Sequence, residues 1–192
     1  MNPRYFGDSY DIVKHSLLRW LASLGPWSAH PMFTEAANTD QADGFSALLG
    51  VPLLSIDVLA QGQNRAEYFA VARSCSTHLF LDPDTGIRAE SAGSKKPAAY
   101  VFVDELVSIA SRRQELLTLV FDQALSHGSE AAGLREKLSL LGKRELHGFA
   151  YRSHACFLLI GPSDAAVHRA HEVLLNEAHL PAGRFVLGDR MS

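Results

Sequence analysis

Two aspartates stand two residues apart in the segment Leu81-Asp82-Pro83-Asp84-Thr85-Gly86, directly after an apolar run. A carboxylate pair of this kind can bind a hard divalent cation such as Mg²⁺ or Mn²⁺. Alternatively, Asp82 can accept a hydrogen bond from a substrate amine or act as a base. A plain turn in which Asp84 bonds its own backbone is the competing interpretation. We expect Asp82 and Asp84 to be catalytic or metal-binding acids, because the apolar run does not need an acid at its end.

A second cluster, residues 5–15, combines aromatic, acidic and basic side chains at the expected start of a helix. Asp11 and Lys14 are one helical turn apart, so they share a helix face. We expect Lys14 to take part in catalysis, and Tyr5, Asp8 and Asp11 to contact a substrate. The alternative is a helix cap with a solvated ion pair, which is worth only roughly 0.2–0.5 kcal/mol.

A third polar group, Phe121-Asp122-Gln123, ends another apolar run, and Ser126 and His127 follow in the next loop. In open α/β folds, ligands bind outside the carboxyl ends of the strands. We therefore expect Gln123 to lie level with Asp82 and to contact a substrate. A polar loop without a function is the alternative.

Hydrophobic periodicity and turn signals predict the elements that would bring these groups together. The expected helices span residues 12–24, 64–74, 104–113, 129–141 and 163–178, and the expected strands span residues 30–34, 77–82, 100–103, 116–121, 147–151, 155–160 and 184–187. Residues 35–44 are expected to form a loop, and residues 46–59 stay open between strand and helix. Asp104 is expected to cap the helix that follows it.

Alternating helices and strands, with most strands unbroken and apolar, are typical of a parallel sheet covered on both faces. The short connection near Tyr151 can only join antiparallel strands. We expect a single α/β domain over residues 1–192. It would be Rossmann-like, with a mostly parallel sheet, helices on both faces and an antiparallel strand pair near the C-terminus.

The composition limits the possible binding partners and the possible cellular compartment of the protein. The formal net charge of −3 exerts no overall attraction on nucleic acid, so such binding would need a local basic patch. Two cysteines, Cys75 and Cys156, are too few for a disulfide framework and lack metal-ligand spacing. No signal-peptide pattern is seen, nor an apolar run of the roughly 20 residues that a membrane helix needs. We expect a cytoplasmic protein without a membrane segment.

At this point two motifs resemble those of a known family. Gly7-Asp8-Ser9-Tyr10-Asp11-Ile12-Val13-Lys14-His15 resembles the N-terminal helix motif of the bacterial large-subunit ribosomal RNA adenine N6-methyltransferases. Leu81-Asp82-Pro83-Asp84 looks like the start of their catalytic Asp-Pro-Pro-Tyr loop. The order of the later elements is similar to that of the class I S-adenosylmethionine-dependent methyltransferase fold. The chain also resembles bacterial proteins of no established activity that share the FGDxxDxxK and DPDTG segments.

The resemblance implies S-adenosylmethionine as the cofactor and a nucleic acid or a nucleotide as the partner. Asp82 would accept a hydrogen bond from the target amine. In the turn after the first strand and beyond it, Thr34, Glu35 and Asp57 are the residues that would contact the cofactor.

The chain also departs from the family pattern at two places. Residues 33–38 lack the glycine-rich turn that lets the backbone approach the cofactor. Asp84 or Thr85 takes the place of the aromatic side chain that stacks on a flipped base, so Thr85 becomes a candidate substrate contact.

Three hypotheses follow. The first is a methyltransferase-like protein with an atypical or lost cofactor loop. The second is a metal-dependent phosphodiesterase or nuclease, in which Asp82 and Asp84 hold Mg²⁺ or Mn²⁺ and Lys14, Lys95 or Lys96 contacts phosphate. The third is a non-catalytic protein that binds a nucleotide or a protein partner.

Overall fold

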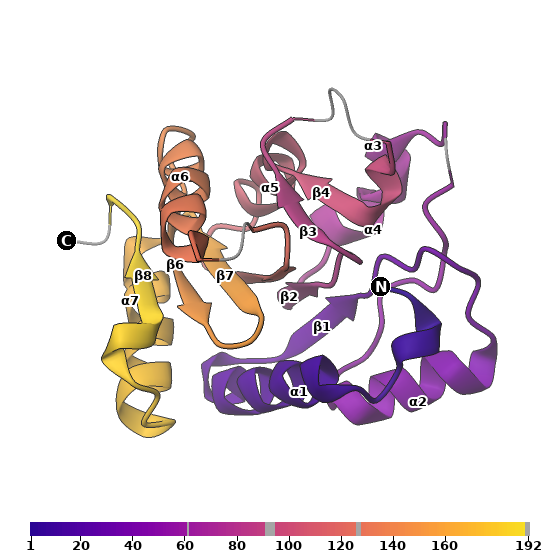
Figure 1. Ribbon diagram of the computed structural model, residues 1–192, viewed down its shortest axis with the longest axis horizontal. Coiled ribbons are helices and arrows are strands. Elements are labelled where there is room, and N and C mark those ends of the chain that lie inside the picture. The colour runs from indigo at the N-terminus through magenta and orange to yellow at the C-terminus, as the bar shows by residue number, and fades with distance from the viewer. Residues whose placement is uncertain (61, 91–94, 126–127, 191–192) are drawn as a thin grey trace.

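The computed structural model describes residues 1–60, 62–90, 95–125 and 128–190. Ser126 and His127, expected in a loop near the site, lie outside the described residues. The chain forms a six-stranded sheet and a separate two-stranded sheet (Figure 1). The large sheet contains, in spatial order, β1 (Trp27–His30), β2 (His78–Leu81), β5 (Thr118–Asp122), β7 (Cys156–Gly161), β6 (His147–Arg152) and β8 (Phe185–Leu187).

The strand directions divide the large sheet into two halves. β1, β2 and β5 pair in parallel, whereas β7 is antiparallel to both β5 and β6, and β8 is antiparallel to β6. β6 therefore runs in the same direction as β1, β2 and β5. The short turn between β6 and β7 imposes their antiparallel pairing, which confirms the predicted strand pair. The α/β class is also confirmed, and the sheet is mixed.

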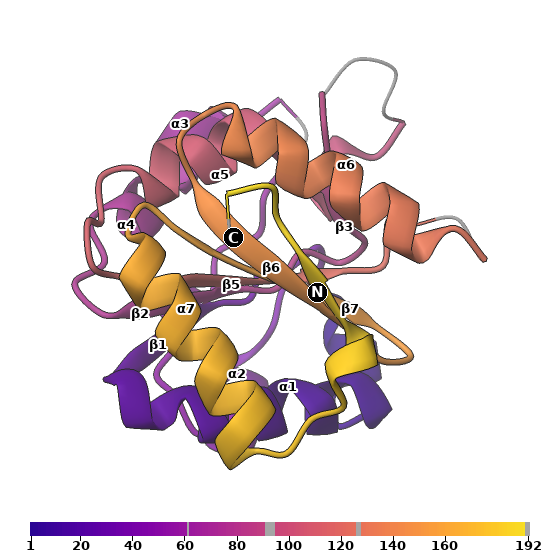
Figure 2. The same cartoon turned by 90° about the vertical axis from the view of Figure 1, so that its left-hand side faces the viewer.

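Helices cover both faces of this sheet (Figures 1 and 2). One face carries α1 (Ser9–Leu21), α2 (Thr39–Leu49) and α7 (Asp164–Glu172), and the other carries α3 (Arg65–Tyr68), α4 (Ala70–Arg73), α5 (Val103–Ala110) and α6 (Glu130–Gly142). Shorter turns are η1 (Pro3–Tyr5), η2 (Ala22–Leu24), η3 (Pro97–Ala99), η5 (Ala182–Arg184) and the π-helical η4 (Val173–Glu177), which continues α7. Among the described helices, none is long and apolar enough to cross a bilayer.

Side-chain alternation along the strands supplies a core to each face. On β2, Leu79 and Leu81 belong to the core under α3 to α6, whereas Phe80 belongs to the core shared with α1, α2 and α7. Asp82 comes two residues after Phe80, directly after the last residue of β2. The buried strand thus carries an acid to its carboxyl end, as predicted.

The segment after β2 leads into the small sheet, in which β3 (Gly86–Arg88) pairs in parallel with β4 (Tyr100–Phe102). The strand expected at residues 100–103 therefore lies outside the large sheet. Gly86 has a φ of 135°, and a Cβ atom there would overlap Oδ1 of Asp122 and lie 2.9 Å from the Asp122 Cα atom. Glycine at this position lets β3 approach the end of β5 closely.

Gly86→Ala is therefore expected to lower the free energy of unfolding by at least about 2 kcal/mol, because it combines backbone strain with a steric overlap. Urea unfolding followed by circular dichroism measures the change. Gly183→Ala is the matched control, since a Cβ atom at Gly183 would meet no atom within 4 Å. Equal stabilities of the two variants would show that β3 can move away from Asp122 at little cost.

The first strand was predicted too late in the chain. Residues 30–34 were expected, but β1 spans Trp27–His30. Gly25 has a φ of 140° and, with Pro26, redirects the chain so that the strand starts immediately. At the other end, Pro31 lacks a backbone N–H and Met32 adopts a φ of 47°, so the strand cannot continue.

The loop predicted at residues 35–44 was also wrong, because α2 begins at Thr39. Asn38 and Gln41 form a capping box at its start. Gly44 lies inside the helix, where an added Cβ atom would be 3.4 Å from the ring of Phe6. Residues 51–58 form no regular element, although Leu53 and Val58 make isolated parallel bridges to Ala29 and Phe33.

Asp104 does not cap α5, which starts one residue earlier at Val103. Glu105 accepts a hydrogen bond from N of Phe102 at 2.9 Å and is paired with Arg65. Asp104 instead forms an exposed ion pair with Arg144 at 3.2 Å. This acid therefore lies on the exposed surface of the protein.

Candidate functional site

Asp82 lies at the carboxyl end of β2 and is 1% exposed. Its Oδ2 accepts a hydrogen bond from Nζ of Lys14 at 2.8 Å, and the same Nζ donates to Oδ1 of Asp11 at 2.9 Å. Lys14 and Asp11 belong to α1 and are buried as well. One ammonium group thus links two buried carboxylates and joins α1 to the end of β2.

The start of α1 explains how this ion-pair network forms. Asp8 is the N-cap, and its Oδ1 accepts hydrogen bonds from N of Tyr10 at 2.9 Å and N of Asp11 at 3.1 Å. Gly7 has a φ of 83° and donates its N–H to Oδ2 of Asp11 at 2.9 Å. The predicted cap is confirmed. However, the ion pair between Asp11 and Lys14 is buried, so the solvated pair considered from the sequence is wrong.

One oxygen of the network is left without a partner. Among the described residues, no hydrogen-bond donor reaches Oδ1 of Asp82, although this atom is buried. A buried acceptor without a partner costs about 1–3 kcal/mol. A ligand that donates a hydrogen bond to this oxygen would remove that cost.

Asp122, at the end of the adjacent β5, shows the contrasting arrangement. It is 0% exposed, yet Oδ1 accepts from N of Ile87 and N of Ala124, both at 3.0 Å, and Oδ2 accepts from Nζ of Lys137 at 2.6 Å. Both of its carboxylate oxygens are satisfied within the protein. Asp122 is therefore structural, and it holds β3 against β5.

The charges of the network favour an ionised lysine. Burial alone would lower the pKa of Lys14, but the carboxylates of Asp82 and Asp11 raise it above its usual value. Burial raises the pKa of the Asp82 carboxyl, and Lys14 offsets part of this effect. Nζ of Lys14 also lies 4.6 Å from the centroid of the Phe121 ring. Lys14 thus holds Asp82 in place as a buried counter-ion.

The α-amino group of Met1 is a further hydrogen-bond donor beside Asp82. It donates to the carbonyl oxygens of Pro31 at 3.1 Å, Met32 at 2.8 Å and Asp82 at 3.1 Å. Burial lowers the pKa of this amine to about 6, although the carboxylate of Asp82 acts in the opposite direction. These contacts tie the segment before α1 to the ends of β1 and β2.

The network forms one wall of a cavity of about 280 Å³, which we call the aspartate cavity. Its lining comprises Met1, Asn2, Tyr5, Asp8, Tyr10, Asp11, Lys14, Asp82, Pro83, Asp84, Phe121 and Gln123. The wall contains both charged groups and aromatic rings. Small-molecule sites commonly combine a largely apolar lining with a few convergent polar groups.

The aspartate cavity brings together most of the predicted site residues, namely Tyr5, Asp8, Asp11, Lys14, Asp82, Asp84 and Gln123. Thr85 is not among its lining residues. The backbone N–H of Thr85 donates to O of Ala99 at 2.8 Å, and its O accepts from N of Gln123 at 2.9 Å. Thr85 thus anchors the loop to its neighbours.

Sequence reasoning missed several lining residues. Tyr10 lies four residues before Lys14, a spacing that places both on one helix face and could have revealed it. Phe121 lies two residues after Leu119 on β5, and both belong to the core that is shared with α1. Strand alternation could therefore have placed Phe121 on the face that α1 covers. Met1 and Asn2 had no sequence signal, because their position depends on tertiary contacts.

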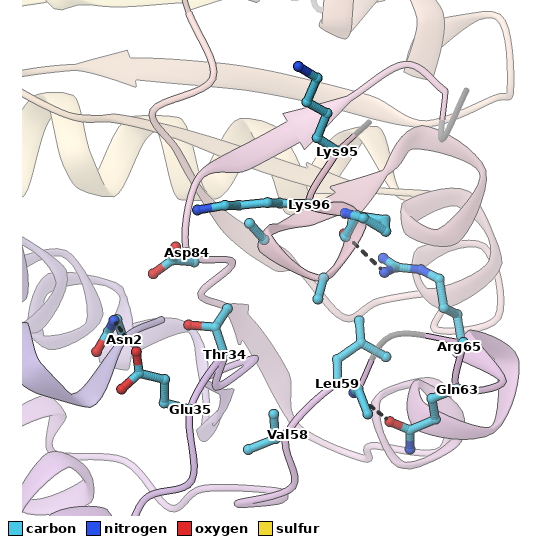
Figure 3. Close-up of a pocket in the computed structure, with 15 residues that line it drawn as sticks. Asn2, Thr34, Glu35, Val58, Leu59, Gln63, Arg65, Asp84, Lys95 and Lys96 are labelled. Carbon is cyan, nitrogen blue, oxygen red and sulfur yellow. Dashed lines mark hydrogen bonds between the residues drawn. The ribbon is translucent and has the colours of Figure 1, made fainter. Parts of the chain in front are cut away.

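A second cavity, of about 470 Å³, adjoins the first through Asn2 and Asp84, which line both. In this adjoining cavity, Thr34 and Glu35 come from the loop after β1, and Lys95 and Lys96 from the segment before η3 (Figure 3). Val58, Leu59, Pro97, Ala98 and Ala99 supply apolar surface. The lining therefore carries both signs of charge around an apolar centre.

Asp57, the third predicted cofactor residue, is not among the residues that line the adjoining cavity. Its side chain is exposed, and Oδ2 accepts a hydrogen bond from the Ser55 hydroxyl at 2.7 Å. Its neighbour Val58 faces the cavity instead. Of the three predicted cofactor contacts, the fold thus brings Thr34 and Glu35 together.

Comparisons of this chain with protein-family models, with curated proteins and with solved structures found no match. The resemblance drawn from the two short motifs therefore stays a prediction. The two cavities and the residues that line them are therefore the basis of the proposed function.

Proposed function

We propose that this chain is a methyltransferase-like protein. It would hold an amino group of a nucleotide or a nucleic-acid base against Asp82 and take S-adenosylmethionine in the adjoining cavity. The observation that carries this proposal is the buried, unpartnered Oδ1 of Asp82, which lines the aspartate cavity and lies two residues before Asp84, a residue of both cavity walls. An acceptor without a partner calls for a ligand that donates a hydrogen bond.

Each group of the network has a role in this proposal. Lys14 fixes Oδ2 of Asp82, so Oδ1 is left to accept an N–H of the target amine. That hydrogen bond orients the lone pair of the nitrogen and makes it a better nucleophile. Because burial raises the pKa of Asp82, its carboxylate can also accept the proton that the amine loses.

The adjoining cavity suits S-adenosylmethionine in size and charge. Its volume of about 470 Å³ falls within the range of roughly 300–1,000 Å³ that is usual for small-molecule sites. Lys96 would face the carboxylate of the cofactor, and Glu35 and Asp84 its positive groups, whereas the Lys95 side chain points away from the other lining residues (Figure 3). When bound, S-adenosylmethionine supplies an electrophilic methyl group. Thr34 and Glu35 follow β1, where ligands of α/β sheets bind.

The metal-dependent alternative is less well supported. Among the described residues, no group of three His, Cys, Asp or Glu side chains gathers around a common point. Lys14 already neutralises Asp82 at 2.8 Å, and a divalent cation there would have to displace or repel this ammonium group. We therefore place the nuclease hypothesis second, with Mn²⁺ binding as its test.

Calorimetric titration of the purified protein with S-adenosylmethionine, and separately with Mn²⁺, tests the proposal. We expect micromolar binding of S-adenosylmethionine and no saturable binding of Mn²⁺. Ala98→Phe should abolish cofactor binding, because the added ring would fill part of the adjoining cavity.

Ala165→Phe is the matched control, since Ala165 is exposed on α7 and does not line that cavity. Thermal unfolding of both variants verifies that they are folded. Absence of cofactor binding by the wild-type protein contradicts the proposed function. Mn²⁺ binding that is lost in Asp84→Ala would favour the metal-dependent alternative.

A further inference from the structure

The loop after β2 carries Asp84 and Thr85, so it offers no aromatic side chain to a ligand. The aspartate cavity nevertheless has aromatic rings in its wall, and they come from other elements: Tyr5 from η1, Tyr10 from α1 and Phe121 from β5. Base-sized ligands are commonly held by stacking on such rings. A ring can stack on a ligand only if its face is not already packed against other side chains.

Tyr10 and Phe121 are already engaged with other groups. The Tyr10 ring stacks on His154 with centroids 4.7 Å apart and meets the edge of Phe121 at 5.8 Å. Phe121 in addition packs against Phe157 at 5.5 Å and lies under the ammonium group of Lys14. These two rings therefore hold α1 and the sheet together.

Tyr5 differs from both. It is 67% exposed while lining the aspartate cavity, and no described aromatic ring packs against it. Its backbone is well anchored: N of Tyr5 donates to O of Asn2, and O of Tyr5 accepts from N of Asp8, both at 3.1 Å. The side chain of Asn2 in turn donates to Glu35 at 3.2 Å. A fixed backbone thus presents a large ring to solvent at the edge of the cavity.

We propose that Tyr5 is a positioning residue that stacks on the planar ring of the ligand and holds its amino group over Oδ1 of Asp82. Tyr5 would supply, from η1, the aromatic side chain that the Asp-Pro-Asp-Thr loop does not carry. This inference rests on the proposed function for the identity of the ligand class. It requires only a planar, amino-bearing heterocycle, either as a free nucleotide or within a single strand.

2-Aminopurine is a suitable probe, because it carries an amino group and its fluorescence decreases when it stacks. We would titrate the protein into 2-aminopurine riboside 5′-monophosphate and, in a parallel arm, into a short single-stranded RNA that contains the same base. The two arms distinguish a free nucleotide from a nucleic acid. We expect saturable quenching in at least one arm. Tyr5→Ala should weaken that binding on the order of ten-fold, as is usual for the loss of a stacking ring.

Tyr5→Phe should restore the affinity, because the ring and not the hydroxyl is needed. Phe6→Ala is the matched control. Phe6 is the next residue and is also exposed, but its ring packs against Phe45 and does not line the cavity. We expect Phe6→Ala to bind within two-fold of wild type. Unchanged affinity in Tyr5→Ala, or no wild-type quenching in either arm, would overturn the role of Tyr5.

Titration of the same variants with S-adenosylmethionine separates this inference from the proposed function. Tyr5 does not line the adjoining cavity, so Tyr5→Ala should bind the cofactor as wild type does. Cofactor binding without 2-aminopurine binding would overturn the inference and leave the proposed function standing. Tyr5-dependent 2-aminopurine binding without cofactor binding would support the role of Tyr5 and contradict the proposed function.

Discussion

Replacement of Lys14 by methionine is expected to lower the free energy of unfolding by about 3–5 kcal/mol, because it leaves buried carboxylates without their counter-ion. Lys14 is the cation between Asp11 and Asp82, and all three side chains are at most 5% exposed. Urea unfolding at neutral pH measures the loss. The control Lys143→Met removes an exposed lysine and should change stability by less than about 0.5 kcal/mol.

The pH dependence gives this prediction a second readout. Burial raises the pKa of Asp82 above its usual value of 3.8, so the folded state keeps a proton that the unfolded chain releases. The contribution of protonated Asp82 to the free energy of unfolding is therefore present at low pH. It is lost as the pH rises from 3.8 through the pKa of Asp82 in the folded state. Without Lys14 this pKa rises further. The deficit of Lys14→Met should therefore be smaller at about pH 5 than at about pH 7.5.

Two outcomes would contradict this account of Lys14. One is a loss below about 1 kcal/mol, which would indicate that water reaches the carboxylates. The other is a double variant, Lys14→Met with Asp82→Asn, that is no more stable than Lys14→Met alone. Removing the charge of Asp82 should restore part of the lost stability, because only Asp11 is then unpaired.

Under the proposed function, Asp82→Asn is expected to reduce methyl transfer by roughly 100-fold or more, since the amide is a poorer hydrogen-bond acceptor and cannot take up a proton. The fold should tolerate the change. The amide oxygen can still accept from Lys14, and the NH₂ group then faces the aspartate cavity. Transfer of a radioactive methyl group from S-adenosylmethionine to total RNA or to single-stranded oligonucleotides measures the activity.

Asp122→Asn is the matched control at the end of the neighbouring strand. Both oxygens of Asp122 accept from N–H donors, so an NH₂ group there must face a donor. This variant should lose about 1–3 kcal/mol of stability and keep its activity per folded molecule. The functional interpretation of Asp82 would be contradicted if Asp82→Asn kept the wild-type rate of methyl transfer. It would also be contradicted if Asp82→Asn lost more stability than Asp122→Asn.

The positions of the candidate site residues were predictable from the sequence wherever local signals determined them. The apolar run before Asp82 defines a buried strand, and the spacing of Asp11 and Lys14 puts both on one helix face. Parallel strands then bring Asp82 and Gln123 to the same edge of the sheet. The sequence could not show that Lys14 reaches Asp82, because this contact joins residues 68 positions apart. The unpartnered Oδ1 likewise depends on packing.

The errors in the fold have physical causes of the same kind. Residues 35–44 were expected to form a loop because of their polar composition and Gly44, yet the Asn38–Gln41 capping box starts a helix there. The predicted first strand ignored that Pro31 and Met32 cannot extend β1. Asp57 was predicted to contact the cofactor under the methyltransferase hypothesis; it does not line the adjoining cavity, whereas its neighbour Val58 does.

Asn2 and Asp84 belong to the walls of both cavities, and this common wall has a thermodynamic consequence. A ligand in one cavity that moves or neutralises Asp84 changes the electrostatic potential at a ligand in the other cavity. The two binding equilibria are then linked, and each ligand must alter the affinity of the other by the same factor. Two ligands that both act on Asp84 would therefore not bind independently, and the order in which they arrive would leave the total binding free energy unchanged.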